Sequence, residues 1–369
     1  MDKYKNIPAD AVSKRGESIA MKTVNQLMDH EHINWVQLEM LVRETFQGIP
    51  NDTMKIKKFS EGYSNHTYLL TIGDWEAVLR RPPFGEIPAK AHDIKREYTI
   101  LSRLHGVYPL APKPYLYKED PGIIGRHFYL MEKKQGVVIN QSIPDNYGSS
   151  ELIGPSISKS IINSLVELQQ VDYKKVNLMD IGKPEGFLER QVHSWIKRYR
   201  LVKTDEIAGV EELEAWLIKN IPTTTDTTIV HNDFKLNNLV LDPNDAGVIK
   251  GVLDWEMATI GDPMSDIGAL LTYWGEASDP DIGISVVTNQ PGFFSRRKLA
   301  ERYAQVSGRD ITDIDYYVAF SFYKLAIILQ QLYYRWKKGE TDDARFSDLH
   351  IPIANLFDLA DLTRRKKIL

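Results

Sequence analysis

Apolar and polar positions follow two different periods along the chain. Short β-rich runs bounded by turn residues dominate the first third of the sequence. Farther along, apolar residues recur every three to four positions, as they do on one face of a helix. The predicted strands are residues 55–59, 66–72, 75–81 and 126–131, and the predicted helices are residues 35–46, 91–104, 188–203 and 318–336, with a further helical stretch from residue 156 onward.

One stretch, residues 229–254, predicts a β-hairpin whose polar residues could form a site. A short apolar run leads into a polar turn, and two β-rich runs then flank a segment rich in Pro, Asn, Asp and Gly. An antiparallel hairpin places the start of its first strand beside the end of its second, so Asn238 and Asp254 should meet at one end. Asp233 lies just upstream and should face the same spot.

These three side chains match the requirements of phosphoryl transfer. The Asn238 carbonyl oxygen and the Asp254 carboxylate can share Mg²⁺, which proteins usually hold with one or two such groups plus substrate phosphates. Asp233 can accept the proton of an attacking hydroxyl. The alternatives are an Asp233 that caps a turn and a hairpin whose polar ends bind nothing. Glu256 should support the metal site from outside the coordination shell.

The order His-x-Asp-x4-Asn followed by Asp-Trp-Glu resembles the aminoglycoside phosphotransferase family, which shares the protein-kinase-like fold with choline kinases. Residues 261–274, 186–195 and 316–335 resemble the branch that includes the kinase-like domains fused to acyl-CoA dehydrogenases. The resemblance implies an α+β, protein-kinase-like fold of two lobes. We expect a small antiparallel-sheet lobe at residues 1–133, which binds nucleotide, and a mainly helical catalytic and acceptor-binding lobe at residues 134–369.

The same resemblance assigns residues to ATP binding. Ser64 and Asn65 belong to the loop over the phosphates, although an ordinary hairpin turn is the alternative. Arg80 stands where protein kinases carry a phosphate-contacting lysine, and Glu97 should pair with it. A surface arginine and a solvated glutamate are the alternatives. Backbone groups of the hinge should meet the adenine ring, and its residues are Met131, Glu132 and Lys133.

Four other features of the second lobe refine the resemblance. Asp266 should hold the catalytic loop by hydrogen bonds, and His231 should brace that loop rather than touch substrate. Gln169 replaces a histidine that relatives usually carry. The aromatic residues of the helix at 318–336 should be core rather than acceptor pocket, and this helix should close the lobe.

Composition narrows the possible partners. The formal net charge of −4 gives no basic footprint for nucleic acid. The absence of cysteine excludes disulfides and thiolate metal ligands. No apolar run approaches the roughly 20 residues that span a bilayer, and no signal-peptide pattern opens the sequence, so we expect a cytoplasmic protein without membrane contact.

Together these features predict an ATP- and Mg²⁺-dependent kinase that phosphorylates a hydroxyl of a small molecule. The branch resemblance favours a hydroxyacyl thioester or another hydroxylated metabolite over an aminoglycoside. Basic residues at 188–203 could meet a phosphate-bearing acceptor or simply face solvent, and acidic patches at 205–214 and 276–281 could meet a polycation. The main alternative is a catalytically silent nucleotide-binding protein of the same fold. A carboxylate-based metal phosphatase is less well supported, because no Asp-x-Asp pair follows a strand.

Overall fold

The computed structural model describes residues 22–23, 33–59, 65–84, 93–223 and 226–368. Within these ranges the chain forms two compact units. Unit 1 comprises the described residues of Met1–Tyr98 and Pro114–Lys133, and unit 2 comprises those of Thr99–Lys113 and Lys134–Leu369.

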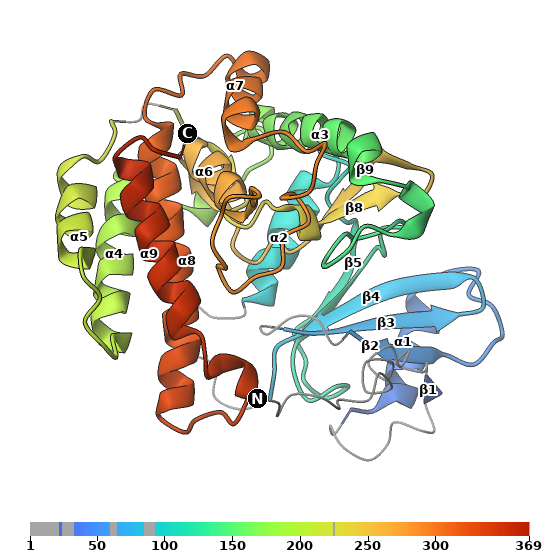
Figure 1. Cartoon of the computed structure of the whole chain (residues 1–369). Helices are drawn as coiled ribbons and strands as arrows, with labels where there is room; N and C mark the ends of the chain where they lie inside the picture. The colour runs from blue at the N-terminus through green and yellow to red at the C-terminus, as the bar shows by residue number, and fades with distance from the viewer. Residues whose placement is uncertain (1–21, 24–32, 60–64, 85–92, 224–225, 369) are drawn as a thin grey trace, which may run out of the picture. The chain divides into compact units, whose positions relative to one another are not determined.

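Unit 1 is built on a six-stranded antiparallel sheet with the strand order β1-β2-β3-β4-β6-β5 (Figure 1). Helix α1 (Trp35–Thr45) and the first part of α2 (Ile94–Leu104) complete it. The strands are β1 (Lys22–Thr23), β2 (Lys55–Lys58), β3 (His66–Ile72), β4 (Trp75–Arg81), β5 (Pro114–Lys118) and β6 (Phe128–Met131).

Local sequence explains the centre of this sheet. Strands β3 and β4 have the predicted bounds and pair from His66↔Arg81 to Ile72↔Trp75. The two-residue connection needs a positive φ, which Gly73 supplies at 58°. The Asn34 side chain accepts a hydrogen bond from the backbone N–H of Gln37 and so caps α1, as its sequence predicts.

Unit 2 is mainly helical. Helix α8 lies at its centre, and helices α4, α6 and α9 pack against it (Figure 1). The helices are α3 (Ser150–Gln170), α4 (Phe187–Val202), α5 (Val210–Lys219), α6 (Met264–Tyr273), α7 (Arg296–Ser307), α8 (Ile314–Lys337) and α9 (His350–Arg364). Two antiparallel pairs accompany them, β7 (Thr228–Val230) with β10 (Thr259–Gly261) and β8 (Leu239–Asp242) with β9 (Asp245–Val252).

Unit 2 departs from the sequence predictions at several helices. Helix α3 begins at Ser150, before Pro155, although the apolar pattern predicted a helix only from Ser156 onward. The predictions did not include α5, α7 or α9. Because α9 packs along α8, the chain does not close with α8 as predicted. In the part of the chain that the structure describes, no helix combines the length and the apolar character needed to cross a bilayer.

Candidate functional site

The hairpin of β8 and β9 brings two candidate metal ligands to one end. Its register pairs Leu239 with Val252, and the backbone N–H of Leu253 donates to the carbonyl oxygen of Asn238 at 2.8 Å. Asn238, in a 3₁₀ turn, and Asp254 therefore both lie at the open end of the hairpin, as the sequence predicts.

The candidate base, Asp233, is held by two neighbours. The Asn238 side-chain amide donates to both the backbone oxygen and Oδ2 of Asp233, each at 2.8 Å. The ammonium group of Lys235 lies 2.8 Å from Asp233 Oδ1, and the Asp233 side chain remains 21% exposed. Burial raises the pKa of Asp233 and the nearby Asp254 carboxylate adds to this, while Lys235 and Asn238 act in the opposite direction. The result is an oriented carboxylate that accepts a proton more readily than a fully solvated aspartate does.

Asp266 anchors the loop that carries Asp233. Its two carboxylate oxygens accept hydrogen bonds from the adjacent backbone N–H groups of His231 and Asn232, both at 2.7 Å. Asn232 adopts a positive φ of 65°, and its side chain donates to the backbone oxygen of Met257. Asp266 is fully buried in the first turn of α6, and burial raises its pKa to about 7 despite the two N–H donors. The loop-holding role expected from the sequence fits this geometry.

His231 braces the same loop from the other side. The backbone N–H of Asp233 donates to its Nδ1 at 3.3 Å, which leaves Nε2 to donate to the backbone oxygen of Leu253 at 3.1 Å. The ring is fully buried against Trp255 and Phe234. Burial lowers the pKa of His231 to about 4, so the imidazole is neutral at pH 7. Both ring nitrogens contact backbone, which makes this histidine a structural element of the loop.

The hairpin end fits a Mg²⁺ ion in the chemistry of its donors. Asn238 uses its amide nitrogen on Asp233, so its carbonyl oxygen is the atom suited to a metal, and Asp254 adds a carboxylate. Among the described residues, no cluster of three or more His, Asp or Glu side chains could hold a metal without help. Mg²⁺ does not need such a cluster, since substrate phosphates and water usually complete its shell.

Lys235 is a candidate site residue that the sequence predictions missed. Burial disfavours its ammonium group, but the charge of Asp233 and the ring of Tyr273, 4.6 Å away, outweigh this, and the pKa of Lys235 is raised. Its signal in the sequence is a basic residue two positions after the candidate base. The cation is therefore fixed beside Asp233.

Unit 1 holds the residues that the resemblance assigns to nucleotide binding. Arg80 on β4 and Glu97 on α2 form an ion pair of 2.5 Å, and both side chains are buried. The predicted pairing is therefore present. Asn65, just before β3, is also buried, whereas Ser64 lies outside the described residues.

The predicted hinge follows the last residues of β6. Met131 ends this strand and pairs with Val78 of β4. The Lys133 ammonium group lies 2.8 Å from Glu76, so its side chain is used within unit 1. Glu132, which lies between Met131 and Lys133 in the sequence, is half-buried. The expected contacts of the hinge backbone with the adenine ring stay a prediction.

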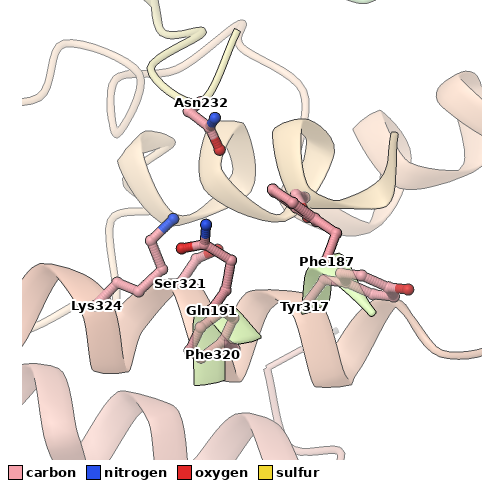
Figure 2. Close-up of a pocket in the computed structure, with 8 residues that line it drawn as sticks. Phe187, Gln191, Asn232, Tyr317, Phe320, Ser321 and Lys324 are labelled. Atoms are coloured by element: carbon pink, nitrogen blue, oxygen red, sulfur yellow. The ribbon is translucent and has the colours of Figure 1, made fainter. Parts of the chain in front are cut away.

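A small pocket opens in unit 2 beside the loop that carries Asp233 (Figure 2). Figure 2 shows the polar ends of Asn232, Gln191 and Lys324 directed toward a common space. Phe320, one of the aromatic residues expected to be core, also contributes to the wall, and so does Tyr317. The lining residues are Phe187 and Gln191 of α4, Asn232 of the loop, Ser265 of α6, and Tyr317, Phe320, Ser321 and Lys324 of α8.

Gln169, which replaces a histidine of the resembling family, has a structural position. Its side-chain nitrogen donates to the backbone oxygen of Pro263, just before α6, at 3.0 Å. Its oxygen accepts from the hydroxyl of Tyr303 at 2.7 Å. Gln169 is buried and ties α3 to α6 and α7, so the amide connects elements that support the catalytic loop.

A small antiparallel sheet with a buried Arg–Glu pair, and a helical unit with an anchored His-x-Asp-x4-Asn loop, define the class of kinase-like phosphotransferases. The chain belongs to the phosphotransferase enzyme family, whose model matches residues 55–301. This confirms the family resemblance and the predicted fold class.

Known relatives agree with this assignment. The chain is 33% identical over 331 residues to acyl-CoA dehydrogenase family member 11 of Mus musculus, with 87% of this chain aligned and 42% of that protein's length spanned. A Ralstonia eutropha protein provisionally classed as an aminoglycoside phosphotransferase is 30% identical with a TM-score of 0.75, over 89% of this chain and 98% of its own. Choline kinase of Cryptosporidium parvum, at 13% identity and a TM-score of 0.62 over 91% and 98% of the chains, shares the fold.

Proposed function

We propose that the protein transfers the γ-phosphoryl group of ATP, with Mg²⁺, to a hydroxyl of a small molecule. The observation that carries this proposal is the arrangement around Asp233. Asn238 and Lys235 orient its carboxylate, and Asp254 lies close enough for its charge to raise the pKa of Asp233. Phosphoryl transfer needs this combination of a proton acceptor, metal ligands and a fixed cation.

Four residues of unit 2 would take part in this mechanism. Asp233 accepts the proton of the attacking hydroxyl, and its buried setting strengthens it as a base. Lys235 holds the carboxylate in place and offsets negative charge on the transferred group. Asn238 and Asp254 would hold Mg²⁺. When bound, the ion neutralises charge on the phosphate oxygens.

In unit 1, the nucleotide would contact Arg80, Asn65, Ser64 and the hinge. Arg80 would contact phosphates through its planar guanidinium group rather than through the point charge of a lysine. Glu97 orients that group through the 2.5 Å ion pair. The hinge residues Met131, Glu132 and Lys133 would offer backbone hydrogen bonds to the base.

The acidic patches give little support for a polycationic acceptor. In the first patch, Glu214 is buried and accepts from Tyr323 and Arg200, and Asp205 pairs with a lysine of α8. In the second, Asp279 pairs with the buried Arg296. These carboxylates serve the fold, so we rank an aminoglycoside below a hydroxyacyl thioester or another hydroxylated metabolite.

The basic helix α4 is also largely engaged within the protein. Arg190 donates to backbone oxygens of the preceding loop, Arg200 pairs with Glu214, and Lys203 pairs with Glu206. The guanidinium group of Arg198 lies over the ring of Trp195. A phosphate-bearing acceptor would therefore meet few of these charges.

The test is ADP release from Mg²⁺-ATP in the presence of hydroxylated metabolites, including acyl thioesters. We expect at least one acceptor to stimulate release and Asp233→Asn to remove most of that stimulation. The matched control is Asp245→Asn, at the exposed turn end of the same hairpin. If no acceptor stimulates release, and Asp233→Asn changes neither nucleotide affinity nor basal hydrolysis, the silent nucleotide-binding protein is the correct description.

The metal assignment has its own test. Asp254 has a φ of 67°, a conformation that asparagine tolerates, so Asp254→Asn removes charge with little backbone strain. We expect this variant to lose the Mg²⁺-dependent part of the melting-temperature rise that ATP produces. An unchanged rise would contradict the role of Asp254 as a ligand.

A further inference from the structure

The pocket beside the catalytic loop contains an ammonium group with no counter-ion in contact. Lys324 extends from α8 toward Asn232 and Gln191 (Figure 2). Within the described residues, its ammonium group makes no ion pair and no hydrogen bond. Its close contacts are the faces of two aromatic rings, Trp195 at 5.7 Å and Phe320 at 5.8 Å.

A second cation lies on α4, another of the helices that line the pocket. The guanidinium group of Arg198 is 4.6 Å from the centre of the Trp195 ring, so Trp195 neighbours both cations. Burial lowers the pKa of Lys324, and the nearby charge of Arg198 adds to this, while Asp266 and Asp233 act in the opposite direction. No carboxylate belongs to the pocket lining as described. The pocket therefore offers one ammonium group among neutral polar side chains and the aromatic rings of Phe187, Tyr317 and Phe320.

Lys324 lies within electrostatic range of the candidate base. The charges of Asp266 and Asp233 both act on Lys324, although neither carboxylate contacts it. Asp266 already accepts two backbone hydrogen bonds, and Asp233 already pairs with Lys235. Asn232, the residue just before Asp233, lines the same pocket as Lys324, so a ligand in this pocket lies beside the loop that carries the candidate base.

We propose that Lys324 binds an anionic group of the phosphoryl acceptor, a carboxylate or a phosphate, and so selects hydroxylated anions over neutral or cationic alcohols. This inference rests on the proposed function and specifies the chemistry of its acceptor. A charge-assisted hydrogen bond in a partly desolvated pocket supplies the selectivity. A polyamine acceptor would meet repulsion from Lys324 and Arg198.

A positioning role for Lys324 predicts a different result from acceptor binding. If Lys324 acts as a distant counter-charge for Asp266, its removal should disturb the catalytic loop and lower kcat for every acceptor. If it binds the acceptor, its removal should raise KM for anionic acceptors alone. The charge of the acceptor thus separates the two roles.

The experiment uses four compounds with one three-carbon skeleton: glycerate, glycerol 3-phosphate, glycerol and 3-amino-1,2-propanediol. Each is titrated calorimetrically into the full chain and tested for stimulation of ADP release. The variants are Lys324→Met, which keeps the length without the charge, and Lys324→Arg, which keeps the charge. Lys338→Met, at the exposed end of α8, is the matched control.

We expect at least one anionic compound to bind the wild-type chain better than glycerol and the amine. Lys324→Met should weaken that binding, and raise KM where turnover is seen, by about 10- to 100-fold. Lys324→Arg should retain most of the affinity, and Lys338→Met all of it. Comparison of glycerate with glycerol 3-phosphate shows whether the anion is a carboxylate or a phosphate.

The inference is overturned if the four compounds bind wild type equally or not at all, or if Lys324→Met changes all of them alike. Its failure is distinguishable from failure of the proposed function. Stimulation of ADP release by neutral alcohols would keep the kinase and refute the anion site. Anion binding that depends on Lys324, without ADP release by any acceptor, would support the site and contradict turnover.

Discussion

Asp266→Asn tests whether the buried carboxylate positions the catalytic base. Both oxygens of Asp266 accept backbone N–H groups at 2.7 Å, from His231 and Asn232. Asparagine has one oxygen and one amide nitrogen, so in the same pose one backbone N–H would face another donor. The loop must shift to relieve that contact. Asp233 follows Asn232 directly, so the shift reaches the base.

The effect on stability comes from two opposing contributions. Loss of a hydrogen bond to a charged group costs about 1.5–3 kcal/mol, and the buried N–H left unpaired costs about 1–3 kcal/mol. The opposing contribution favours folding, because the asparagine variant has no buried carboxylate to ionise. Burial raises the pKa of Asp266 from 3.8 to about 7, a difference of roughly three units or ~4 kcal/mol. The two contributions act in opposite directions and partly cancel, so we expect the free energy of unfolding to change by less than the loss of the hydrogen bonds alone would cause.

Activity should not show this cancellation. Misplacement of a catalytic group by about 1 Å can lower a rate about 100-fold. We therefore expect kcat for ADP release to fall about 100-fold, and the KM for ATP to change little. Urea unfolding and steady-state kinetics at pH 8 measure the two quantities on the same preparation.

Asp262→Asn is the matched control for this substitution. Asp262 is also buried, and it accepts from the backbone N–H of Met264 and the hydroxyl of Tyr317, but it has no bond to the catalytic loop. Its variant should keep kcat within a few-fold of wild type. A role of Asp266 in positioning the base is contradicted if Asp266→Asn keeps its kcat, or if both variants lose it equally.

Three further predictions concern the elements around the site. Glu97→Gln breaks the buried pair with Arg80 and should lower the free energy of unfolding by about 3–5 kcal/mol; a loss below 1 kcal/mol in urea titrations would contradict this. The pKa of about 4 for His231 lies below the 6.5 of the unfolded chain, so His231 makes the fold less stable as pH falls from 6.5 to 4. The pKa of Asp266 is raised to about 7, so Asp266 makes the fold more stable as pH falls over about the same range. Asp266→Asn should therefore lose stability more steeply than wild type between pH 6.5 and 4.5, and equal slopes would be evidence against the two pKa shifts. Gly268→Ala places a Cβ 2.7 Å from a side chain of α8 and should destabilise by about 1–3 kcal/mol, so an unchanged melting temperature would show that α6 and α8 can separate without cost.

The sequence could predict those parts of the site that depend on neighbours along the chain. Turn residues and apolar alternation define the β8–β9 hairpin, and a hairpin alone brings Asn238 and Asp254 to one end. The bounds of β3 and β4 follow from a two-residue turn at Gly73 in the same way. The spacing from Asn34 to Gln37 likewise predicted a helix cap, since the contact spans three residues.

The parts that remained hidden depend on packing between distant segments. Lys324 follows the catalytic loop by about 90 residues, and it reaches the pocket because α8 packs against α4 and α6. Apolar residues nearly all round the helix at 318–336 predicted a core helix, which is correct for Tyr323, but apolar character alone does not distinguish core from a pocket wall such as Phe320. Segment 99–113 belongs to unit 2 because Tyr108 is buried and donates to Ser164 of α3.

Unusual backbone conformations lie in the same region. Among the described residues, the non-glycine positions with positive φ are four, and two of them, Asn232 and Asp254, flank the catalytic hairpin. Such conformations cost roughly 1 kcal/mol or more each, and they persist where surrounding contacts enforce them. Asp266 enforces the conformation of Asn232, at the further cost of a buried carboxylate. Stability alone would favour glycine and an apolar side chain at such positions. The residues present are better explained by the need to fix Asp233 between Asn238 and Lys235 than by any gain in folding.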